Sequence, residues 1–449
     1  MKRSLLLAVL IVTVLAAVTM MAAGCEKTDE MLYVMNWYEY IDEDLLGEFE
    51  EYYYEKTGKT ISVVYITQDT NEIMITQTIN ADSAASGGKM NLDLVCPSEY
   101  AIQKLLTLDL IQPLGEKKEE LWNGIQPLFT TEIQKTFSDL EINGQRVDLT
   151  DYFVPYMMGT LGIMYNTDKV TEKDLEEGWG LLWNSGNNPE LKGKIYMKDS
   201  IRDAYVAAVM RLKETGELPV GYENMTAQQL INNSDDQLIA AVEEVLKAQK
   251  EQVMGYSVDF DKDEMKAGRA YVDLAWSGDA AYTIEEAAEE GVNLDYFVPE
   301  SGSNIWFDGW VVTKKAQNPE AAIMFVEYLN QPVNAVRNMM AIGYSSAVDP
   351  EILRADEEAM EVLAENEYDE EEFFSNQVMY YTGTADLGVM KDFGNKESSL
   401  VNMWERVKAQ DNDPTVLIFI IVIVVVAVLV AVALIIVFKN KKSTRRKVN

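Results

Sequence analysis

Acidic and aromatic side chains recur together at the points where short apolar runs end. One such run is followed by the sequence NWYEY at residues 36–40, and a later run ends in WSGD at residues 276–279. The first run has the composition of a strand, and a helical pattern follows from Asp42. Ligands of open α/β sheets bind beyond the carboxyl ends of the strands, so these side chains suit ligand recognition. The alternative is that Trp37 and Tyr40 only pack the following helix against the sheet.

Charge and composition exclude several classes of function. The chain of 449 residues has 38 Lys and Arg against 74 Asp and Glu, a formal net charge of -36. This charge argues against binding to nucleic acid or to an anionic membrane surface and favours a cationic ligand. Histidine is absent, which removes the commonest general base and the commonest zinc ligand. We therefore expect no catalytic residues, no cofactor and no metal site.

The first 25 residues have the pattern of a targeting segment. Lys2 and Arg3 precede an apolar run, and small residues stand directly before Cys25. This order resembles a bacterial lipoprotein signal, in which Cys25 is acylated after cleavage in front of it. Ala22 stands where such signals usually carry leucine, so ordinary cleavage and an uncleaved anchor are alternatives. Cys96 then has no partner and is expected to be a small buried residue of a strand.

The other end of the chain contains a long apolar run. Residues 416–438 carry no charge, and at 1.5 Å per residue they reach about 35 Å, enough to cross a bilayer core. We therefore expect a C-terminal transmembrane helix. The basic tail, residues 439–449, places the C-terminus in the cytoplasm, since positive charge favours that side. The expected location is the cell membrane, with the binding domain extracytoplasmic, in the periplasm or on the outer face.

Between these ends, strand and helix patterns alternate. The first predicted elements are a helix over 42–57, a strand over 61–66, a helix over 71–80 and a strand over 92–96. Later ones are strands over 194–197 and 270–275 and helices over 201–215 and 236–252. This order predicts two α/β lobes with largely parallel sheets. The tetrapeptide Tyr-Phe-Val-Pro occurs at 152–155 and at 296–299, which we interpret as two crossings between the lobes.

Five short motifs, in their order and spacing, resemble the spermidine/putrescine-binding proteins of bacterial ABC polyamine importers. They are NWYEYI at 36–41, DLVCPSEY at 93–100, WSGD at 276–279, WFD at 306–308 and IGY at 342–344. The resemblance covers about residues 31–408. It implies a two-lobe periplasmic-binding-protein fold of type II with two crossover strands. It also implies that a polyamine, putrescine or spermidine, is held between the lobes and delivered to ABC permease subunits with a cytoplasmic ATPase.

The resemblance also divides the chain. The first α/β lobe is expected to comprise residues 31–155 and 300–345. The second lobe, with the C-terminal helices, is expected to comprise 156–299 and 346–408. The lipoprotein-like signal at 1–25, the transmembrane helix at 416–438 and the tail at 439–449 complete the predicted organisation. Ordinary members of the family have no membrane span of their own, so the predicted helix is a departure.

The residue types suit a polyamine independently of the family. Each ammonium group needs a carboxylate to replace its hydration, and the methylene stem packs well on aromatic rings. Carried over residue by residue, the resemblance implies a ligand-binding set: Trp37, Tyr40, Ser98, Tyr100, Asp203, Trp276, Asp279, Trp306, Asp308 and Tyr344.

Specific roles can be assigned within this set. Asp308 is expected to hold one terminal ammonium and Asp203 or Asp279 another, while Trp276 and Trp306 hold the stem. Three structural alternatives remain open: Asp279 caps its helix, Asp203 pairs with its neighbour Arg202, and Tyr344 packs at a hinge.

Departures from the family pattern bear on the choice of ligand. Tyr38 stands where a small hydroxyl residue is usual, Ser200 where a further acid occurs, and Met390 where glutamine is expected. A bulkier wall with one acid fewer favours a shorter or less charged ligand such as putrescine.

Other classes of function remain as alternatives. They are a carbohydrate hydrolase with Asp279 and Asp308 as its acid/base pair, a receptor for a sugar or for ferric iron bound by Tyr380 and Tyr381, and a membrane-tethered sensor.

Overall fold

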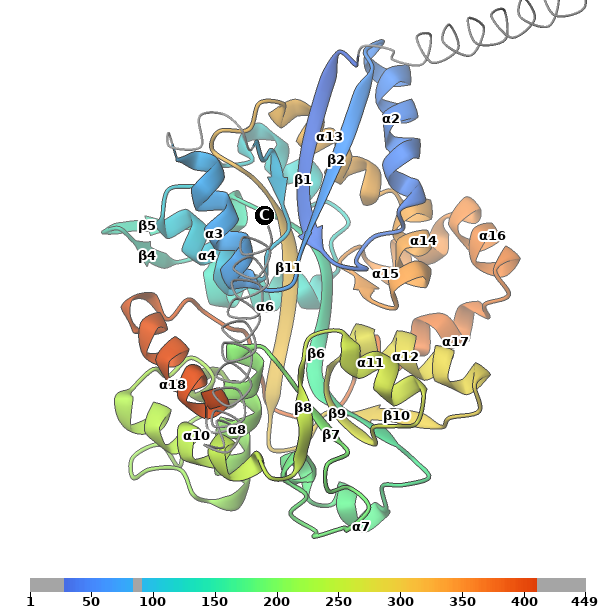
Figure 1. Ribbon diagram of the computed structural model, residues 1–449. Helices are drawn as coiled ribbons and strands as arrows, with labels where there is room; N and C mark the ends of the chain where they lie inside the picture. Colours follow the sequence, from blue (N-terminus) through green and yellow to red (C-terminus); the bar gives the residue numbers. More distant parts are fainter. Residues whose placement is uncertain (1–27, 84–90, 410–449) are drawn as a thin grey trace, which may run out of the picture.

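Two long strands run side by side through the middle of the molecule and join its two lobes (Figure 1). They are β6 (Val154–Asn166) and β11 (Ser303–Val312), which pair antiparallel from Ile305 opposite Thr160 to Trp310 opposite Val154. The computed structural model describes residues 28–83 and 91–409. All 13 residues of β6 are buried, as expected for a strand covered on both faces.

The first lobe, in the upper half of Figure 1, is built on three parallel strands next to β11. They are β1 (Glu30–Trp37), β2 (Ile61–Gln68) and β3 (Leu94–Val95), in the order β2-β1-β3-β11. The helices of this lobe are α2 (Asp44–Thr57), α3 (Asn71–Asp82), α4 (Glu99–Thr107), α5 (Lys118–Leu121), α6 (Pro127–Phe137) and α13 (Pro319–Leu329), with the hairpin β4 (Leu140–Ile142) and β5 (Gln145–Val147).

The second lobe, in the lower half of Figure 1, repeats this plan. Its strands β7 (Ile195–Lys198), β8 (Val253–Ser257) and β9 (Val272–Trp276) are parallel, and β9 joins β6 antiparallel. The other elements of this lobe are α7 (Glu172–Leu175), α8 (Ile201–Thr215), α9 (Ala227–Leu230), α10 (Asp236–Gln249), α11 (Phe260–Lys266), α12 (Ser277–Glu289), β10 (Leu294–Phe297) and α18 (Glu397–Ala409).

A group of short elements follows α13 and packs beside both lobes. It comprises α14 (Pro332–Ile342), β12 (Ser345–Ser346), α15 (Pro350–Ala355), α16 (Glu357–Glu365), α17 (Glu370–Ser375) and β13 (Leu387–Gly388). The single-turn 3-10 helices are η2 (Gly115–Lys117), η3 (Leu149–Asp151) and η5 (Gly394–Lys396), and η4 (Gly178–Trp183) is a longer one.

Local sequence explains where the elements beside the cleft begin and end. Helix α2 ends because Gly58 adopts φ 73° and its N–H donates to the Tyr54 carbonyl, a conformation that costs glycine little. Helix α3 begins directly after Thr70, its N-cap, whose hydroxyl accepts a hydrogen bond from the N–H of Ile73 at 3.3 Å. This cap fixes the chain directly after the carboxyl end of β2.

The two-lobed α/β fold expected from the sequence is confirmed. The first Tyr-Phe-Val-Pro segment, residues 152–155, leads into β6, and the second, residues 296–299, precedes β11. The exact lobe boundaries given above stay a prediction. Cys96 is free and buried directly after β3.

One part of the expected fold class is corrected. Among residues 28–83 and 91–409, no helix is both long and apolar enough to cross a membrane. The longest of them, α8, has 15 residues and reaches about 22 Å, short of a hydrocarbon core of about 30 Å. The described part of the chain therefore gives no support to the expected C-terminal transmembrane helix, or to the membrane anchoring and cytoplasmic tail that depended on it. Residues 416–438 and 439–449 lie outside the described part of the chain, as do residues 1–25 with Cys25, whose lipidation stays a prediction.

Candidate functional site

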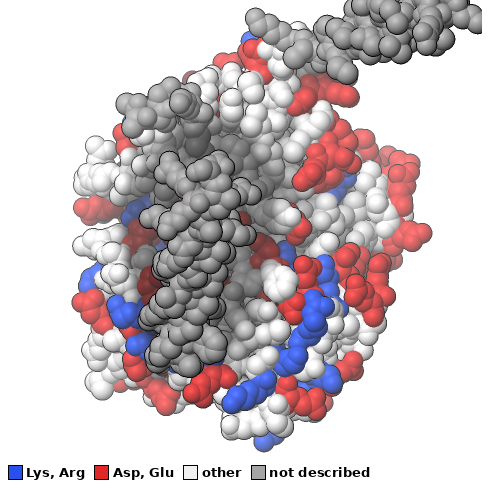
Figure 2. All heavy atoms as spheres, viewed as in Figure 1, with Lys and Arg blue, Asp and Glu red and all other residues white. Residues whose placement is uncertain are grey.

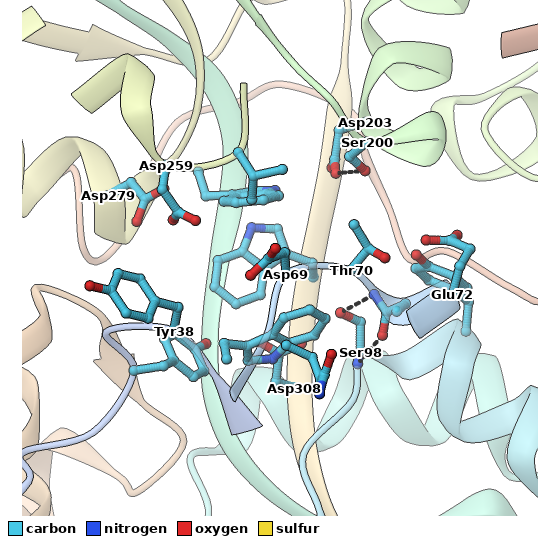
Figure 3. Close-up of a pocket in the computed structure, with 18 of the residues that line it drawn as sticks. Tyr38, Asp69, Thr70, Glu72, Ser98, Ser200, Asp203, Asp259, Asp279 and Asp308 are labelled. Carbon is cyan, nitrogen blue, oxygen red and sulfur yellow. Dashed lines mark hydrogen bonds between the residues drawn. The ribbon is translucent and has the colours of Figure 1, made fainter. Parts of the chain in front are cut away.

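A pocket opens between the lobes, where the carboxyl ends of the parallel strands of both lobes meet (Figure 3). Trp37 ends β1 and Gln68 ends β2, while Trp276 ends β9 on the opposite side. Ser200 and Asp259 follow β7 and β8 at the same edge of the second sheet. The pocket takes in about 860 Å³ of space, including open solvent at its mouth.

The pocket is strongly acidic. Eight carboxyl side chains line it, and none of its lining residues in the described part of the chain is Lys or Arg. These acids are Glu39, Asp69, Glu72, Glu99, Asp203, Asp259, Asp279 and Asp308. Figure 2 also shows more acidic than basic side chains on the visible face of the first lobe, whereas the second lobe shows both kinds. The field of the pocket acids concentrates cations near the cleft.

The structure brings together all ten side chains that the sequence assigned to ligand binding. Each of Trp37, Tyr40, Ser98, Tyr100, Asp203, Trp276, Asp279, Trp306, Asp308 and Tyr344 lines this pocket. Tyr38, Ser200 and Met390, the departures from the family pattern, line it as well.

Sequence reasoning missed several lining residues. Asp69 and Glu72 follow β2, and Asp259 follows β8, so the same strand-end rule that selected Trp37 could have found them. Asn304 lies within β11 and not after the end of a strand, so this rule does not select it.

Asp308 is the buried acid at the centre of the pocket. It is 5% exposed, and the pairing of β11 with β6 is irregular between Asp308 and Gly309. A Cβ at Gly309 would lie 2.6 Å from the Phe153 ring, so this close approach requires glycine. The irregularity aims the Asp308 carboxylate into the cleft, as bulges often do at sites.

Among residues 28–83 and 91–409, no Lys or Arg forms an ion pair with the Asp308 carboxylate. Its Oδ1 is buried and makes no hydrogen bond among the described residues, although Ser98, Tyr40 and Trp37 lie near it. Burial raises the pKa of Asp308 to about 7. A ligand ammonium would restore the ionised form and remove this cost.

Aromatic rings form a rigid wall next to Asp308. Tyr344 lies edge-on to Tyr40, with ring centroids 4.9 Å apart, and to Trp306 at 5.6 Å. A Cβ at Gly278 would lie 2.1 Å from the Tyr344 ring, so α12 begins in direct contact with this wall. Rings fixed in this way can pack on methylene groups and face a cation.

Asp279 is held by partners within the protein. Its carboxylate lies 3.4 Å from Lys198 Nζ and 3.5 Å from Lys262 Nζ, and it accepts a hydrogen bond from the Tyr344 hydroxyl at 2.7 Å. Burial alone would raise the pKa of Asp279, but Lys262 and Lys198 hold it below its usual value. No side chain caps the start of α12, so the capping role considered for Asp279 is not observed.

Asp203 differs from Asp279 because it makes no ion pair among the described residues. Its carboxylate accepts a hydrogen bond from Ser200 Oγ at 2.5 Å, and burial raises its pKa. The pairing with Arg202 considered above is not observed. The guanidinium of Arg202 instead donates to the carbonyls of Lys391 and Ile231, at 2.7 and 3.3 Å.

Glu99 has a structural role at the floor of the pocket. Its carboxylate accepts hydrogen bonds from the N–H groups of Phe307 at 3.2 Å and Met390 at 3.3 Å. Burial raises the pKa of Glu99 to about 8. These bonds join α4 to β11 and to the segment that carries Met390.

The chain matches a known family over most of its length. The family model described as bacterial extracellular solute-binding protein matches residues 48–361. The spermidine/putrescine-binding periplasmic protein of Escherichia coli is 26% identical over 324 residues, which cover 72% of this chain and 79% of that protein. The putrescine-binding periplasmic protein PotF of Escherichia coli is 27% identical over 330 residues, with the same coverage.

Solved structures agree with this match. The spermidine/putrescine ABC transporter substrate-binding protein PotD of Streptococcus pneumoniae superposes with a TM-score of 0.59 at 26% identity. The alignment covers 85% of this chain and 99% of that one. The resemblance to spermidine/putrescine-binding proteins read from the five motifs is confirmed. On the match, the fold and the position of the pocket, the chain belongs to the bacterial extracellular solute-binding protein family.

Proposed function

We propose that this protein is an extracytoplasmic receptor that captures a polyamine between its lobes and delivers it to an ABC permease with a cytoplasmic ATPase. The observation that carries the proposal is the buried Asp308 carboxylate, which lines the pocket with Trp306 and Tyr40 and pairs with no Lys or Arg of the described residues. A buried charge of this kind is costly unless a partner arrives. The names of the relatives, which bind spermidine and putrescine, support the same ligand class.

The roles follow from the geometry. Asp308 holds one ammonium group and Asp203, with Ser200 behind it, holds another. The rings of Trp306, Trp276 and Tyr344 pack on the methylene stem between them. Charge-assisted hydrogen bonds fix the spacing between the two nitrogen atoms, and the rings exclude water from the stem.

Closure of the lobes completes the site. Lys104 on α4 of the first lobe pairs with Glu397 on α18 of the second, at 2.6 Å. Lys262 on α11 lies 3.5 Å from Glu39 in the loop after β1. Contacts made across the cleft favour the closed form, and a ligand needs only to bind that form better than the open one. Binding and release then require no chemical step, in keeping with a family of solute-binding proteins.

The other classes of function fit the pocket less well. An uncharged sugar would leave Asp308 and Asp203 without counter-ions. Tyr380 and Tyr381 are not among the lining residues, so they do not form an iron site in this cleft. A hydrolase would need Asp279 to act as a general acid or base, but Lys262 and Lys198 lower the pKa of Asp279, so it holds no proton to donate and is a weak base.

Isothermal titration of the purified protein with putrescine, spermidine and maltose tests the proposal. We expect saturable binding of at least one polyamine and none of maltose. Binding of maltose, or of no polyamine by a folded sample, would overturn the ligand class.

A further inference from the structure

Two lysine side chains occupy the Asp279 end of the pocket wall. Lys262 Nζ lies 3.5 Å from Glu39, 3.6 Å from Asp259 and 3.5 Å from Asp279. All three of these acids line the pocket, whereas Lys262 itself stands behind them. A bound amine would need the same arrangement, in which several carboxylates surround one ammonium group.

Lys198, like Lys262, makes contacts that the ammonium group of a ligand could make. Its Nζ lies 4.7 Å from the centre of the Trp276 ring, within cation–π range. The same ammonium is 2.7 Å from Asp261 and 3.4 Å from Asp279, and the side chain is fully buried. One cation position on Trp276 and both oxygens of Asp279 are therefore taken by the protein's own lysines.

The opposite end of the pocket is different. In the described part of the chain, no Lys or Arg forms an ion pair with Asp308 or Asp203. Figure 3 shows Glu72 on the same side of the pocket as Asp203, with Asp279 and Asp259 on the other. Unmatched negative charge thus lies around Asp308 and Asp203, and the charge at Asp279 is matched internally.

We propose that Lys198 and Lys262 take the place of a ligand ammonium at Asp279, so that the pocket accepts a diamine between Asp308 and Asp203 and discriminates against a triamine. This inference rests on the proposed function and specifies its ligand. The third ammonium of a triamine, extended past Trp276, would find both oxygens of Asp279 occupied and would meet two lysine ammonium groups of like charge.

Lys262→Gln tests the proposal because it removes one internal cation and keeps a polar side chain. We expect the wild type to bind putrescine at least about tenfold more tightly than spermidine. In the variant the preference for putrescine over spermidine should fall by about tenfold, while loss of the contact with Glu39 weakens the binding of both ligands alike. Lys266→Gln is the matched control, since Lys266 lies on the same helix and pairs with Asp263, away from the pocket.

Measuring the affinity of the wild-type protein for a series of ligands tests the proposal even if the variant does not fold. N-propylputrescine is spermidine without the terminal amino group of its propyl arm, so it keeps the length but has two charges. We expect it to bind more tightly than spermidine, because charge rather than length is rejected. Equal binding of the two compounds would overturn the proposal, as would an unchanged ratio of spermidine to putrescine affinity in Lys262→Gln. If the wild type binds no polyamine at all, the proposed function itself fails.

Discussion

Lys104 and Glu397 form an ion pair of 2.6 Å that joins the two lobes, since Lys104 belongs to α4 and Glu397 begins α18. Asp392 lies 3.8 Å from the same ammonium. Both side chains of the main pair are partly exposed, at 19% and 39%, so the pair is worth about 1 kcal/mol or less. Its position across the cleft matters more than its strength, because every contact between the lobes biases closure.

Lys104→Gln should therefore weaken polyamine binding by about two- to fivefold without unfolding the protein. Small-angle scattering of the unliganded variant should show a more open average shape. Lys117→Gln is the control, since Lys117 pairs with Glu120 and Glu327 within the first lobe. If the two substitutions have equal effects, the Lys104–Glu397 ion pair does not favour closure of the lobes.

Asp203→Asn should weaken polyamine binding by about tenfold or more, because it removes a carboxylate that forms no ion pair within the described part of the chain. Ser200→Ala deletes only the hydrogen bond of 2.5 Å to Asp203 and should cost less. Titration calorimetry on both variants gives the comparison. If Asp203→Asn binds like the wild type, the second ammonium is held elsewhere.

Gly278→Ala should destabilise the fold by about 1 to 3 kcal/mol, because the new Cβ would lie 2.1 Å from the Tyr344 ring. Displacement of Tyr344 should also weaken ligand binding. Gly47→Ala is the matched substitution: Gly47 lies inside α2 with nothing within 4 Å of its Cβ position, so it should stabilise by about 0.5 to 1 kcal/mol. Thermal unfolding measures both. If Gly278→Ala leaves the free energy of unfolding unchanged, the aromatic wall is not tightly fixed.

Polyamine affinity should depend on pH through Asp308. Burial raises the pKa of this carboxyl to about 7, and an ammonium binds its ionised form. Binding below pH 7 must therefore release a proton, and affinity should fall by up to about tenfold per pH unit as the pH drops below 7. Above pH 8 the affinity should level off as far as Asp308 is concerned.

Calorimetry at pH 8, 7 and 6, in buffers of different ionisation enthalpy, measures both the affinity and the protons released. Asp308→Asn should lose this pH dependence. A flat affinity from pH 6 to 8 in the wild type would mean that Asp308 is ionised without the ligand.

Much of the fold follows from local sequence. Helix α8 spans residues 201–215 as the apolar spacing predicts, and Gly216 ends it with φ 70°. The strand expected over 92–96 is shorter, Leu94–Val95, because pairing with β1 and β11 sets its length rather than propensity. The acidic helices α16 and α17 bury Leu363, Phe373 and Phe374, which the charge of their sequence alone does not indicate.

The candidate site was predictable to the extent that it depends on strand ends and motifs. Trp37 and Trp276 stand directly at the ends of β1 and β9, where ligands of parallel sheets bind. The pairing of Asp279 with Lys198 and Lys262 could not be foreseen, because these side chains come from different elements that only the folded lobe brings together. The same limit applies to the irregular pairing that aims Asp308 into the cleft, since it depends on the register between β11 and β6.

The most direct test of the account is titration calorimetry of the wild type and Asp308→Asn with putrescine, with Asp139→Asn as an exposed-acid control. The account predicts saturable binding that Asp308→Asn weakens by about 2 kcal/mol, or about 30-fold, and that Asp139→Asn leaves unchanged. Equal binding by the wild type and a folded Asp308→Asn variant would contradict the central role of this carboxylate.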